Sequence, residues 1–512
     1  MHALDLFVLG GYLALVAAVG LRAGRQTTTA TDYALAGRSL PAWAVGLSIV
    51  ATETSALTFI GAPIQSLRGD WTYAQLALGS ALGRLLVGSL LIGAFYRAGV
   101  VTVYDFLGQR FGVLSQTVAT VLFTVGRLLG SGVRLYGGAI ALVVVARIPF
   151  PMAIALIAGV AVAYTMLGGL RSVVWTDVIQ GLLLGGGALL ALYTLFQGLD
   201  QPVAELVAQL RADDSHSKLR FFDFTPSLQI AYTFWAGLIG STVLTMSTHG
   251  TDQDMIQRAL ACEDASAARR SLALSALISV PITLLFLGVG SLLWLTFAGD
   301  TGAAAKAAEI AQQQGFASDA RGFDFLFPVY ILESLPVGLR GLILAALFAT
   351  AMSSLDSAVS ALASTTTHSL VRPWLQHAGR PLTDEGFVRW ARGLAPAFGL
   401  LLVLVALVVW LREGAGDAQS GFGVLALGLK VLTWIFPPLL GIFLVGTLSQ
   451  RGSDRGNLIA LATGIGSLLL IEAWPALFGV PSPWAWTWNP VVGCALSGLV
   501  ALAFAPRKTE AA

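Results

Sequence analysis

Four oxygen-bearing side chains lie close together between residues 353 and 357: Ser353, Ser354, Asp356 and Ser357. They interrupt a long apolar stretch, GLILAALFATAMSSLDSAVSALA, which is long enough to form a helix across a membrane. At about 100° per residue, the four side chains share less than half of the helix circumference. A carboxylate at this depth costs roughly 2.5–3.5 kcal/mol and normally faces a pathway or a partner.

Hydroxyl and carboxylate oxygens are the ligands of hard cations, so this cluster predicts a Na⁺ site. The alternative is structural: serines in membrane helices often bond back to their own backbone or let neighbouring helices approach. An aspartate beside three serines favours the ion site, and the helix that carries them must then be positioned by other helices.

The composition places those helices in a membrane. The chain has 512 residues, of which 56% are hydrophobic and 11% are charged, against about 25% charged residues in soluble proteins. The mean hydropathy is +0.77. The net charge of +2 gives no basis for nucleic acid as a partner. Cys262 and Cys494 show neither metal-ligand nor disulfide spacing, so we expect free thiols.

Apolar segments of about 20 residues predict thirteen membrane helices. They fall near 4–22, 40–65, 71–96, 115–145, 150–168, 173–197, 229–257, 271–298, 335–370, 387–411, 421–448, 456–475 and 488–506. The excess of Lys and Arg in alternate loops predicts an outside N-terminus and a cytoplasmic C-terminus in the cell membrane. We expect the protein to function as a monomer.

No ATP-binding or dinucleotide-binding motif is present, so neither ATP nor an organic cofactor is expected. Glu53, His249 and Asp252 could be imagined as a catalytic set, but the sequence supplies no nucleophile or metal spacing beside them. The chain is therefore not expected to be an enzyme.

Several motifs together resemble the sodium/solute symporter family, which includes proline, sugar, sialic acid, iodide and monocarboxylate carriers. GGLRSVVWTDVIQ closely matches a family signature, and GLILAALFATAMSSLDS is similar to the family's eighth core helix. Similar stretches are DYALAGRSLPAWAVGLSIVATETSALTFIGAP, VTVYDFLGQRFG, HGTDQDMIQRAL and IFPPLLGIFLVGTLSQR.

The resemblance implies an all-α membrane protein with the LeuT-type fold, in which two inverted repeats of five helices follow one extra N-terminal helix. The first core helix of each repeat is broken at mid-membrane, where ion and solute bind. The expected units are 1–39 (extra helix and first cytoplasmic loop), 40–197 (first repeat), 198–228 (external loop), 229–450 (second repeat) and 451–512 (two further helices and a tail).

The resemblance also implies the ion ligands. The main Na⁺ site would use the backbone carbonyls of Ala51, Thr54 and Thr350 and the hydroxyls of Ser353 and Ser354. Some family members bind a second Na⁺, whose ligands here would be Asp177, Asp356 and Ser357 together with Ser353. Two nearby carboxylates could instead share a proton, or Asp177 could simply pair with an arginine.

For the solute, family sugar carriers place Gln and Glu where this chain has Thr58 and Ala77, which disfavours a neutral hexose. Arg134 and Lys430 favour an organic anion, although they could instead neutralise Asp356, Asp177 or Glu53. The candidate solute-binding residues are Thr58, Gln75, Ala77, Ser80, Arg134, Thr245, Thr248, His249, Ser279 and Lys430.

These observations predict a sodium-coupled symporter that imports a small polar or anionic solute by alternating access. A proton-coupled permease of the same fold is the nearest alternative, with Asp177 or Asp356 titrating. A solute-binding membrane sensor is an alternative of another class, and the short C-terminal end AFAPRKTEAA offers no output domain for it.

Overall fold

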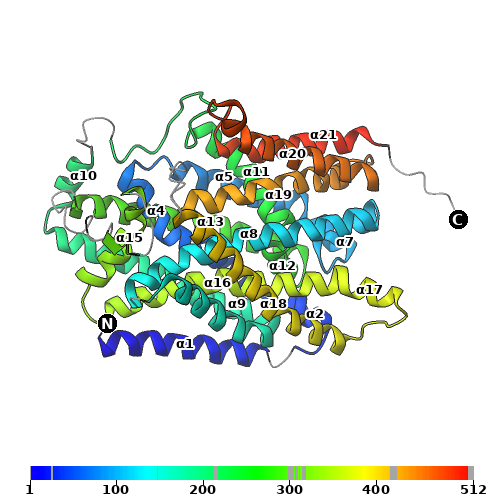
Figure 1. The fold of residues 1–512 in the computed structure, drawn as a ribbon, viewed down its shortest axis with the longest axis horizontal. Coiled ribbons are helices and arrows are strands. Elements are labelled where there is room, and N and C mark those ends of the chain that lie inside the picture. Colours follow the sequence, from blue (N-terminus) through cyan, green and yellow to red (C-terminus); the bar gives the residue numbers. More distant parts are fainter. Residues whose placement is uncertain are drawn as a thin grey trace.

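The computed structural model describes residues 2–24, 27–146, 148–211, 217–297, 319–414 and 424–505, together with 305, 309–310 and 312–313. Within these residues the chain is helical and forms no β-strand, and Leu40 and Cys262 make one isolated backbone bridge. The helices run side by side in one bundle (Figure 1).

The helices of the first part are α1 (Ala3–Gly24), α2 (Ala30–Leu35), η1 (Ala36–Arg38), α3 (Ala42–Glu53), α4 (Ala56–Arg68), α5 (Ala74–Leu90), α6 (Ile92–Ala98), α7 (Val103–Arg110), α8 (Val113–Ala146), α9 (Phe150–Leu199) and α10 (Val203–Arg211). The second part holds η2 (Ala236–Gly240), α11 (Ser241–Thr251), α12 (Gln253–Leu260), α13 (Ala265–Phe297), α15 (Asp319–Ser334), α16 (Leu339–Thr366), η3 (Thr367–Val371) and α17 (Arg372–His377). It ends with α18 (Asp384–Gly414), α19 (Val424–Leu448), α20 (Asp454–Phe478), η4 (Trp486–Trp488) and α21 (Asn489–Ala503).

Ten of the described helices are long and apolar enough to cross a membrane, and α3 with α4 makes an eleventh, bent span. The predicted count of thirteen is not confirmed, because two expected spans are shorter than a membrane crossing. The segment Phe150–Ala163 is a short apolar helix. In the segment 229–257, α11 has only 11 residues and ends where Asp252 takes an extended backbone conformation.

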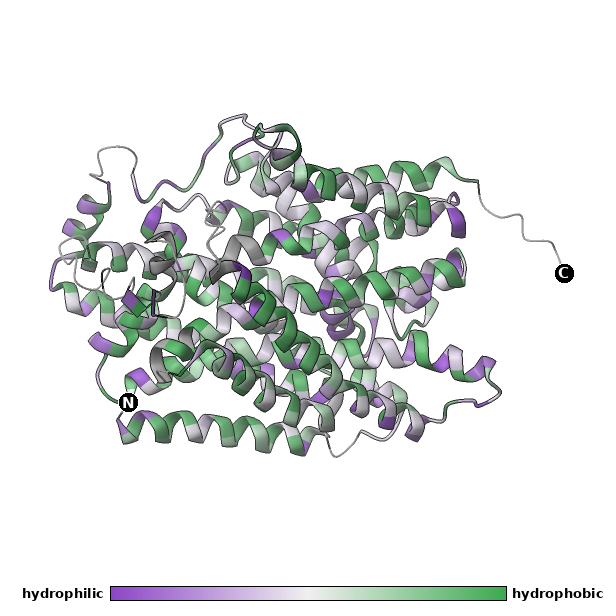
Figure 2. Cartoon of the chain, in the orientation of Figure 1, coloured by the Kyte–Doolittle hydropathy of each residue, from purple (hydrophilic) through white to green (hydrophobic). Residues whose placement is uncertain are grey.

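Apolar side chains cover the outside of the bundle. Figure 2 shows α1 as largely hydrophobic along its length. The large exposed side chains include Phe7, Leu182, Leu400 and Leu499, all on long apolar helices. Exposed apolar side chains of this kind suit a lipid surface.

The helix α16 lies at the centre of the bundle and is almost entirely buried. It contacts α1, α3, α4, α8, α9, α12 and α18. Its alanines and serines are small, which lets neighbouring helices approach closely. The predicted cation cluster is therefore placed where many elements can reach it.

The helix α9 is interrupted at Gly169, which has φ 60° and ψ −165°. A Cβ atom at this position would lie 2.8 Å from the carbonyl oxygen of Tyr33 in α2. Only glycine adopts such a backbone conformation readily and leaves room for this contact. The interruption falls between the spans predicted at 150–168 and 173–197.

The helices α10 and α15 lie at one end of the bundle, and α7 and α17 at the other (Figure 1). At the latter end, His368 Nε2 in η3 lies 3.1 Å from the Asp105 carboxylate in α7. Burial alone would raise the pKa of Asp105, but hydrogen bonds from His368 and from the Thr102 and Val101 backbone N–H groups hold it below its ordinary value. This pair, which we call the His368–Asp105 latch, joins the end of α16 to α7.

Candidate ion and solute site

A break between α3 and α4 opens the backbone at the centre of the bundle. The two helix axes differ by 64°. Thr54 has φ −77° and ψ 74°, and Ser55 is extended. The run ATETSA is polar at mid-span, and an unwound backbone there is tolerated only where it lines a cavity or finds other partners. This confirms the expectation that the span at 40–65 is broken.

Carbonyl groups at the break turn toward other helices. The Thr52 carbonyl oxygen accepts hydrogen bonds from Arg134 Nη1 in α8 at 3.3 Å and from Ser354 Oγ in α16 at 3.4 Å. Ser354 Oγ also lies 3.3 Å from the Thr350 carbonyl oxygen. The structure thus brings Ser354 of α16 against the last turn of α3, which contains Ala51 and is followed by Thr54.

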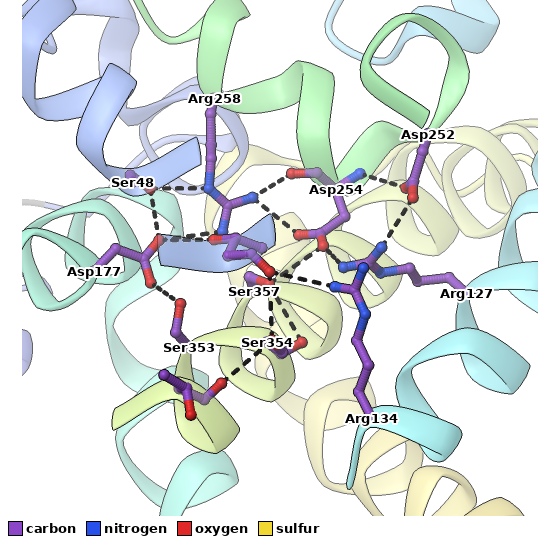
Figure 3. A network of polar contacts seen from close by, with 12 residues as sticks. Ser48, Arg127, Arg134, Asp177, Asp252, Asp254, Arg258, Ser353, Ser354 and Ser357 are labelled. Atoms are coloured by element: carbon purple, nitrogen blue, oxygen red, sulfur yellow. Dashed lines mark hydrogen bonds and ion pairs between the residues drawn. The ribbon is translucent and has the colours of Figure 1, made fainter. Parts of the chain in front are cut away.

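Ser353 faces a different group. Its hydroxyl donates to Asp177 Oδ1 in α9 at 2.6 Å. Asp177 Oδ2 accepts from Ser48 at 2.6 Å, from Thr52 at 3.3 Å and from Arg258 Nη2 at 3.2 Å. Asp177 and Arg258 are fully buried, and Figure 3 shows them side by side. The carboxylate is thus surrounded by three hydroxyls and a guanidinium.

The ion pairs continue through the bundle from Asp177 (Figure 3). Arg258 Nη1 lies 3.1 Å from Asp254 Oδ1, and Arg127 in α8 pairs with both Asp254 and Asp252. The distance from Arg127 Nη1 to Asp252 Oδ2 is 2.9 Å. This buried charge network, made of Asp177, Arg258, Asp254, Arg127 and Asp252, joins α8, α9 and α12.

One of the residues predicted for a second sodium, Ser357, contacts another carboxylate. Ser357 donates to Asp254 Oδ2 at 3.2 Å instead. Asp356 is buried on α16. The alternative in which Asp177 pairs with an arginine is the one present in this structure, and the partner is Arg258.

A cavity of about 130 Å³ lies beside the break. Eight of the ten predicted solute-binding residues line it, from α4, α5, α8, α11 and α13: Thr58, Ala77, Ser80, Arg134, Thr245, Thr248, His249 and Ser279. Residues that the sequence did not single out for this site also line it, notably Tyr73, Arg84, Arg127 and Glu53.

Gln75 and Lys430 are not among the residues that line this cavity. The Gln75 amide binds the loop before η2, donating to the Tyr232 carbonyl oxygen at 3.0 Å and accepting from the Asp223 N–H at 3.1 Å. Lys430 Nζ in α19 lies 2.6 Å from Glu472 Oε1 in α20. Their hydrogen-bonding groups point to neighbouring elements and not to the cavity.

The cavity carries charges of both signs. Glu53 pairs with Arg84, whose Nη1 also donates to Ser279 Oγ at 2.6 Å and to the Ser275 carbonyl oxygen at 2.8 Å. Within the described residues, Arg134 has no carboxylate within the 4.0 Å of an ion pair, and its one hydrogen bond goes to the neutral Thr52 carbonyl. A cation without an ionic partner suits an anionic ligand.

The sequence indicates that the buried arginines have partners, since a charged side chain inside an apolar span needs one. The partners themselves could not be assigned, because Asp177 and Arg258 lie 81 residues apart and Arg127 and Asp252 lie 125 apart. Only the packing of α8, α9 and α12 brings them together.

A family model described as the sodium:solute symporter family matches residues 33–464. The chain belongs to this family. Membership confirms the resemblance inferred from the motifs and identifies the chain as a multi-pass sodium-coupled solute transporter. Na⁺ is its coupling ion.

Relatives with different solutes cover most of the chain. The sodium/sialic acid symporter NanT of Aliivibrio fischeri is 28% identical over 92% of this chain and 88% of its own length. The human sodium/iodide cotransporter is 29% identical over 90% and 67%, and the human sodium-coupled monocarboxylate transporter 1 is 28% identical over 90% and 72%.

Solved structures show the same fold. A Na⁺-coupled sialic acid symporter in a substrate-bound outward-open state superposes with a TM-score of 0.82, at 24% identity, and covers 99% of both chains. Mhp1, a nucleobase-cation-symport-1 family transporter in a closed conformation, has a TM-score of 0.52 at 16% identity and covers 94% of both. The fold is therefore that of LeuT-like transporters.

Proposed function

We propose that this symporter imports a small organic anion together with Na⁺, and that Arg134 binds the anionic group of the solute. The observation that carries the proposal is Arg134, which lines the cavity, has no carboxylate partner among the described residues and donates to the same broken helix that Ser354 contacts. The solutes in the names of the relatives given above, sialic acid, iodide and monocarboxylates, are all anions.

The main Na⁺ site in this proposal is formed by the carbonyl groups of Ala51, Thr54 and Thr350 and the hydroxyls of Ser353 and Ser354. The contact of Ser354 with α3 supports it, because oxygens of both helices then meet at one place. Binding of Na⁺ here would fix the broken α3–α4 segment against α16 and so favour solute binding in the adjoining cavity. Linkage requires the solute to raise Na⁺ affinity by the same factor.

A second Na⁺ at Asp177, Asp356 and Ser357 is a further part of the proposal. It requires Arg258 to leave the Asp177 carboxylate, because the four lone-pair directions of that carboxylate are engaged by Ser48, Thr52, Ser353 and Arg258. Each Na⁺ moved inward through 100 mV contributes about 2.3 kcal/mol, which is roughly a 50-fold accumulation of solute from voltage alone.

For the architecture, we propose thirteen membrane helices arranged as two inverted repeats of five, over residues 40–197 and 229–450, after one extra helix. The 64° break in the α3–α4 span and the interruption at Asp252 after α11 support this, since each falls in the first helix of its repeat. The N-terminus is placed outside, the C-terminus in the cytoplasm, and the protein acts as a monomer.

The test is transport and stability in reconstituted liposomes. Thermal stability is measured in NaCl, KCl and LiCl and at several pH values, and uptake of small carboxylates is measured with an inward Na⁺ gradient. We expect Na⁺-specific stabilisation and Na⁺-dependent uptake that Arg134→Gln abolishes, while Arg372→Gln, at the start of α17, leaves uptake intact. If pH alone shifts stability and Na⁺ matches K⁺, the proton-coupled alternative replaces the sodium site.

A further inference from the structure

The hydrogen-bond acceptors that line the cavity together with Arg134 define the solute more narrowly, provided that the proposed anion site holds. Two carboxylates line the cavity, Asp252 and Glu53. Asp252 is buried against Arg127, whereas 29% of the Glu53 side chain is exposed. One of its oxygens accepts from Ser80 at 3.3 Å and the other pairs with Arg84. A carboxylate has about four lone-pair sites, so Glu53 keeps acceptor capacity toward the cavity that it lines.

The hydrogen bonds around Glu53 fix it as an acceptor. Thr245 Oγ1 donates to Ser80 Oγ at 3.0 Å, and Ser80 Oγ donates in turn to Glu53. Arg84 is almost fully buried and neutralises the charge of Glu53. The cavity thus presents an acceptor that needs a hydrogen-bond donor from the solute but does not need a second positive charge.

His249 supplies a second acceptor. Its Nδ1 lies 3.2 Å from Thr248 Oγ1, and this hydroxyl also lies 3.2 Å from the Leu244 carbonyl oxygen and 3.3 Å from the Thr245 carbonyl oxygen. When the hydroxyl donates to one of these carbonyl groups, Nδ1 of the neutral ring is the donor and Nε2 is an acceptor. Nε2 is buried and has no hydrogen-bond partner among the described residues, although His249 lines the cavity.

The size of the cavity limits the solute. Its volume is about 130 Å³, close to the roughly 150 Å³ of a protein cavity that holds benzene. A molecule with about six to nine non-hydrogen atoms fits this space. A sugar acid of the size of sialic acid is more than twice as large.

We infer that the solute is a small hydroxycarboxylate, with its carboxylate on Arg134 and its hydroxyl donating to Glu53 or His249. A carboxylate without a hydroxyl would offer these acceptors no hydrogen-bond donor. Binding sites that are built to bind a hydroxyl discriminate strongly against analogues that lack it. An amino acid would add a positive charge where Arg84 already neutralises Glu53.

Three probes with one carbon skeleton test this inference: lactate, propionate and alanine, which differ only in carrying a hydroxyl, a hydrogen or an ammonium group. Their binding to the full-length purified protein is measured from thermal stabilisation in NaCl. We expect lactate to bind at least about tenfold more tightly than propionate and than alanine. Propionate binding as tightly as lactate, or alanine binding more tightly, would overturn the inference without any mutation.

Glu53→Gln tests the residue. An amide carries a donor as well as an acceptor and loses the charge that strengthens the hydrogen bond, so we expect the lactate-to-propionate ratio to fall at least about threefold. Glu472→Gln is the matched control, because Glu472 is also paired with a basic residue but lies outside the cavity, and its ratio should stay at the wild-type value. An unchanged ratio in Glu53→Gln would remove Glu53 from solute recognition.

The same series separates this inference from the proposed function. If none of the three probes shifts stability while Na⁺ alone still does, the hydroxycarboxylate is wrong and sodium coupling stands. If Na⁺ itself gives no stabilisation over K⁺, the proposed sodium site has failed, and with it the basis for this inference.

Discussion

Ser353 and Ser354 are adjacent in the chain but face different partners, and this divides their expected roles. Ser354 lies against the Thr52 carbonyl at the break, while Ser353 donates to Asp177. A helix turns by about 100° per residue, so neighbours on one helix necessarily reach different elements. Substitutions at the two positions should therefore have different consequences.

Ser354→Ala removes one hydroxyl ligand of the proposed Na⁺ site. We expect the apparent Na⁺ affinity to fall about tenfold or more, since a ligand interaction of about 1.4 kcal/mol corresponds to that factor. The measurement is thermal stability titrated with NaCl. Ser364→Ala is the control on the same helix, because Ser364 donates only to the Ala361 carbonyl. Equal loss in both variants would assign the effect to α16 packing.

Asp177→Asn should destabilise the protein even without Na⁺. It removes a fully buried charge that is paired with Arg258, and breaking such a pair typically costs about 3–5 kcal/mol, here reduced because Arg258 keeps Asp254. The readout is the midpoint of thermal unfolding in KCl. Combining it with Arg258→Gln should cost less than the two single changes added together. Additive costs would mean that the pair does not act as a unit.

At the scale of elements, the bend in α9 depends on one residue. Gly169→Ala should lower stability by at least about 1–3 kcal/mol, because alanine at φ 60° and ψ −165° is strained and its Cβ would press on the Tyr33 carbonyl. Thermal unfolding and expression level are the measurements. Gly186→Ala, on the same helix with open space around its Cβ position, should be neutral or slightly stabilising.

Most long helices could be predicted from hydropathy alone, because helices such as α1 and α18 each contain an apolar stretch long enough to cross a membrane. The break at 51–56 could also be predicted, since polar side chains in mid-span require a cavity. The shortness of α11 could not, because threonines and serines in Ser241–Thr251 resemble a tolerable span until the interruption at Asp252 is seen.

The candidate site was predictable in its residue types and only partly in its contacts. Arg134 and seven other residues that line the cavity were found, as was Ser354 at the break, because the family resemblance places them on particular helices. Arg258 as the partner of Asp177, and Arg84 as the partner of Glu53, depend on how α5, α9, α12 and the break pack. Lys430 was expected in the cavity because the family resemblance puts it one residue from a substrate position, but its ammonium group pairs with Glu472 on α20.

At the scale of the whole molecule, the two ends of the bundle should be distinguishable chemically. A cysteine at Gln201, exposed after α9, should react with a membrane-impermeant maleimide in intact cells. A cysteine at Gln376, exposed in α17, should react only after permeabilisation. The background replaces Cys262 and Cys494 with serine. The reverse pattern would place the N-terminus in the cytoplasm.

The His368–Asp105 latch gives the protein a pH-dependent component of stability. Because the pKa of Asp105 is held below its ordinary value, its contribution is present above about pH 4 and is lost as pH falls through the lowered pKa. Asp105→Asn should thus unfold at a lower temperature than wild type at neutral pH, and the difference should shrink in acid. Asp384→Asn, an exposed change at the start of α18, should show no such convergence.

The His368–Asp105 latch lies directly beyond the end of α16, so a movement of α16 would change the distance between its two side chains. Ser354 and His368 lie 14 positions apart on one nearly continuous rod of about 20 Å. A tilt of α16 by only about 5° around Ser354 would displace His368 by about 2 Å. This is enough to break its contact of 3.1 Å with Asp105. If Na⁺ binds at Ser354 as proposed, α16 would thus couple ion binding in the middle of the membrane to separation of the His368–Asp105 pair at one end of the bundle.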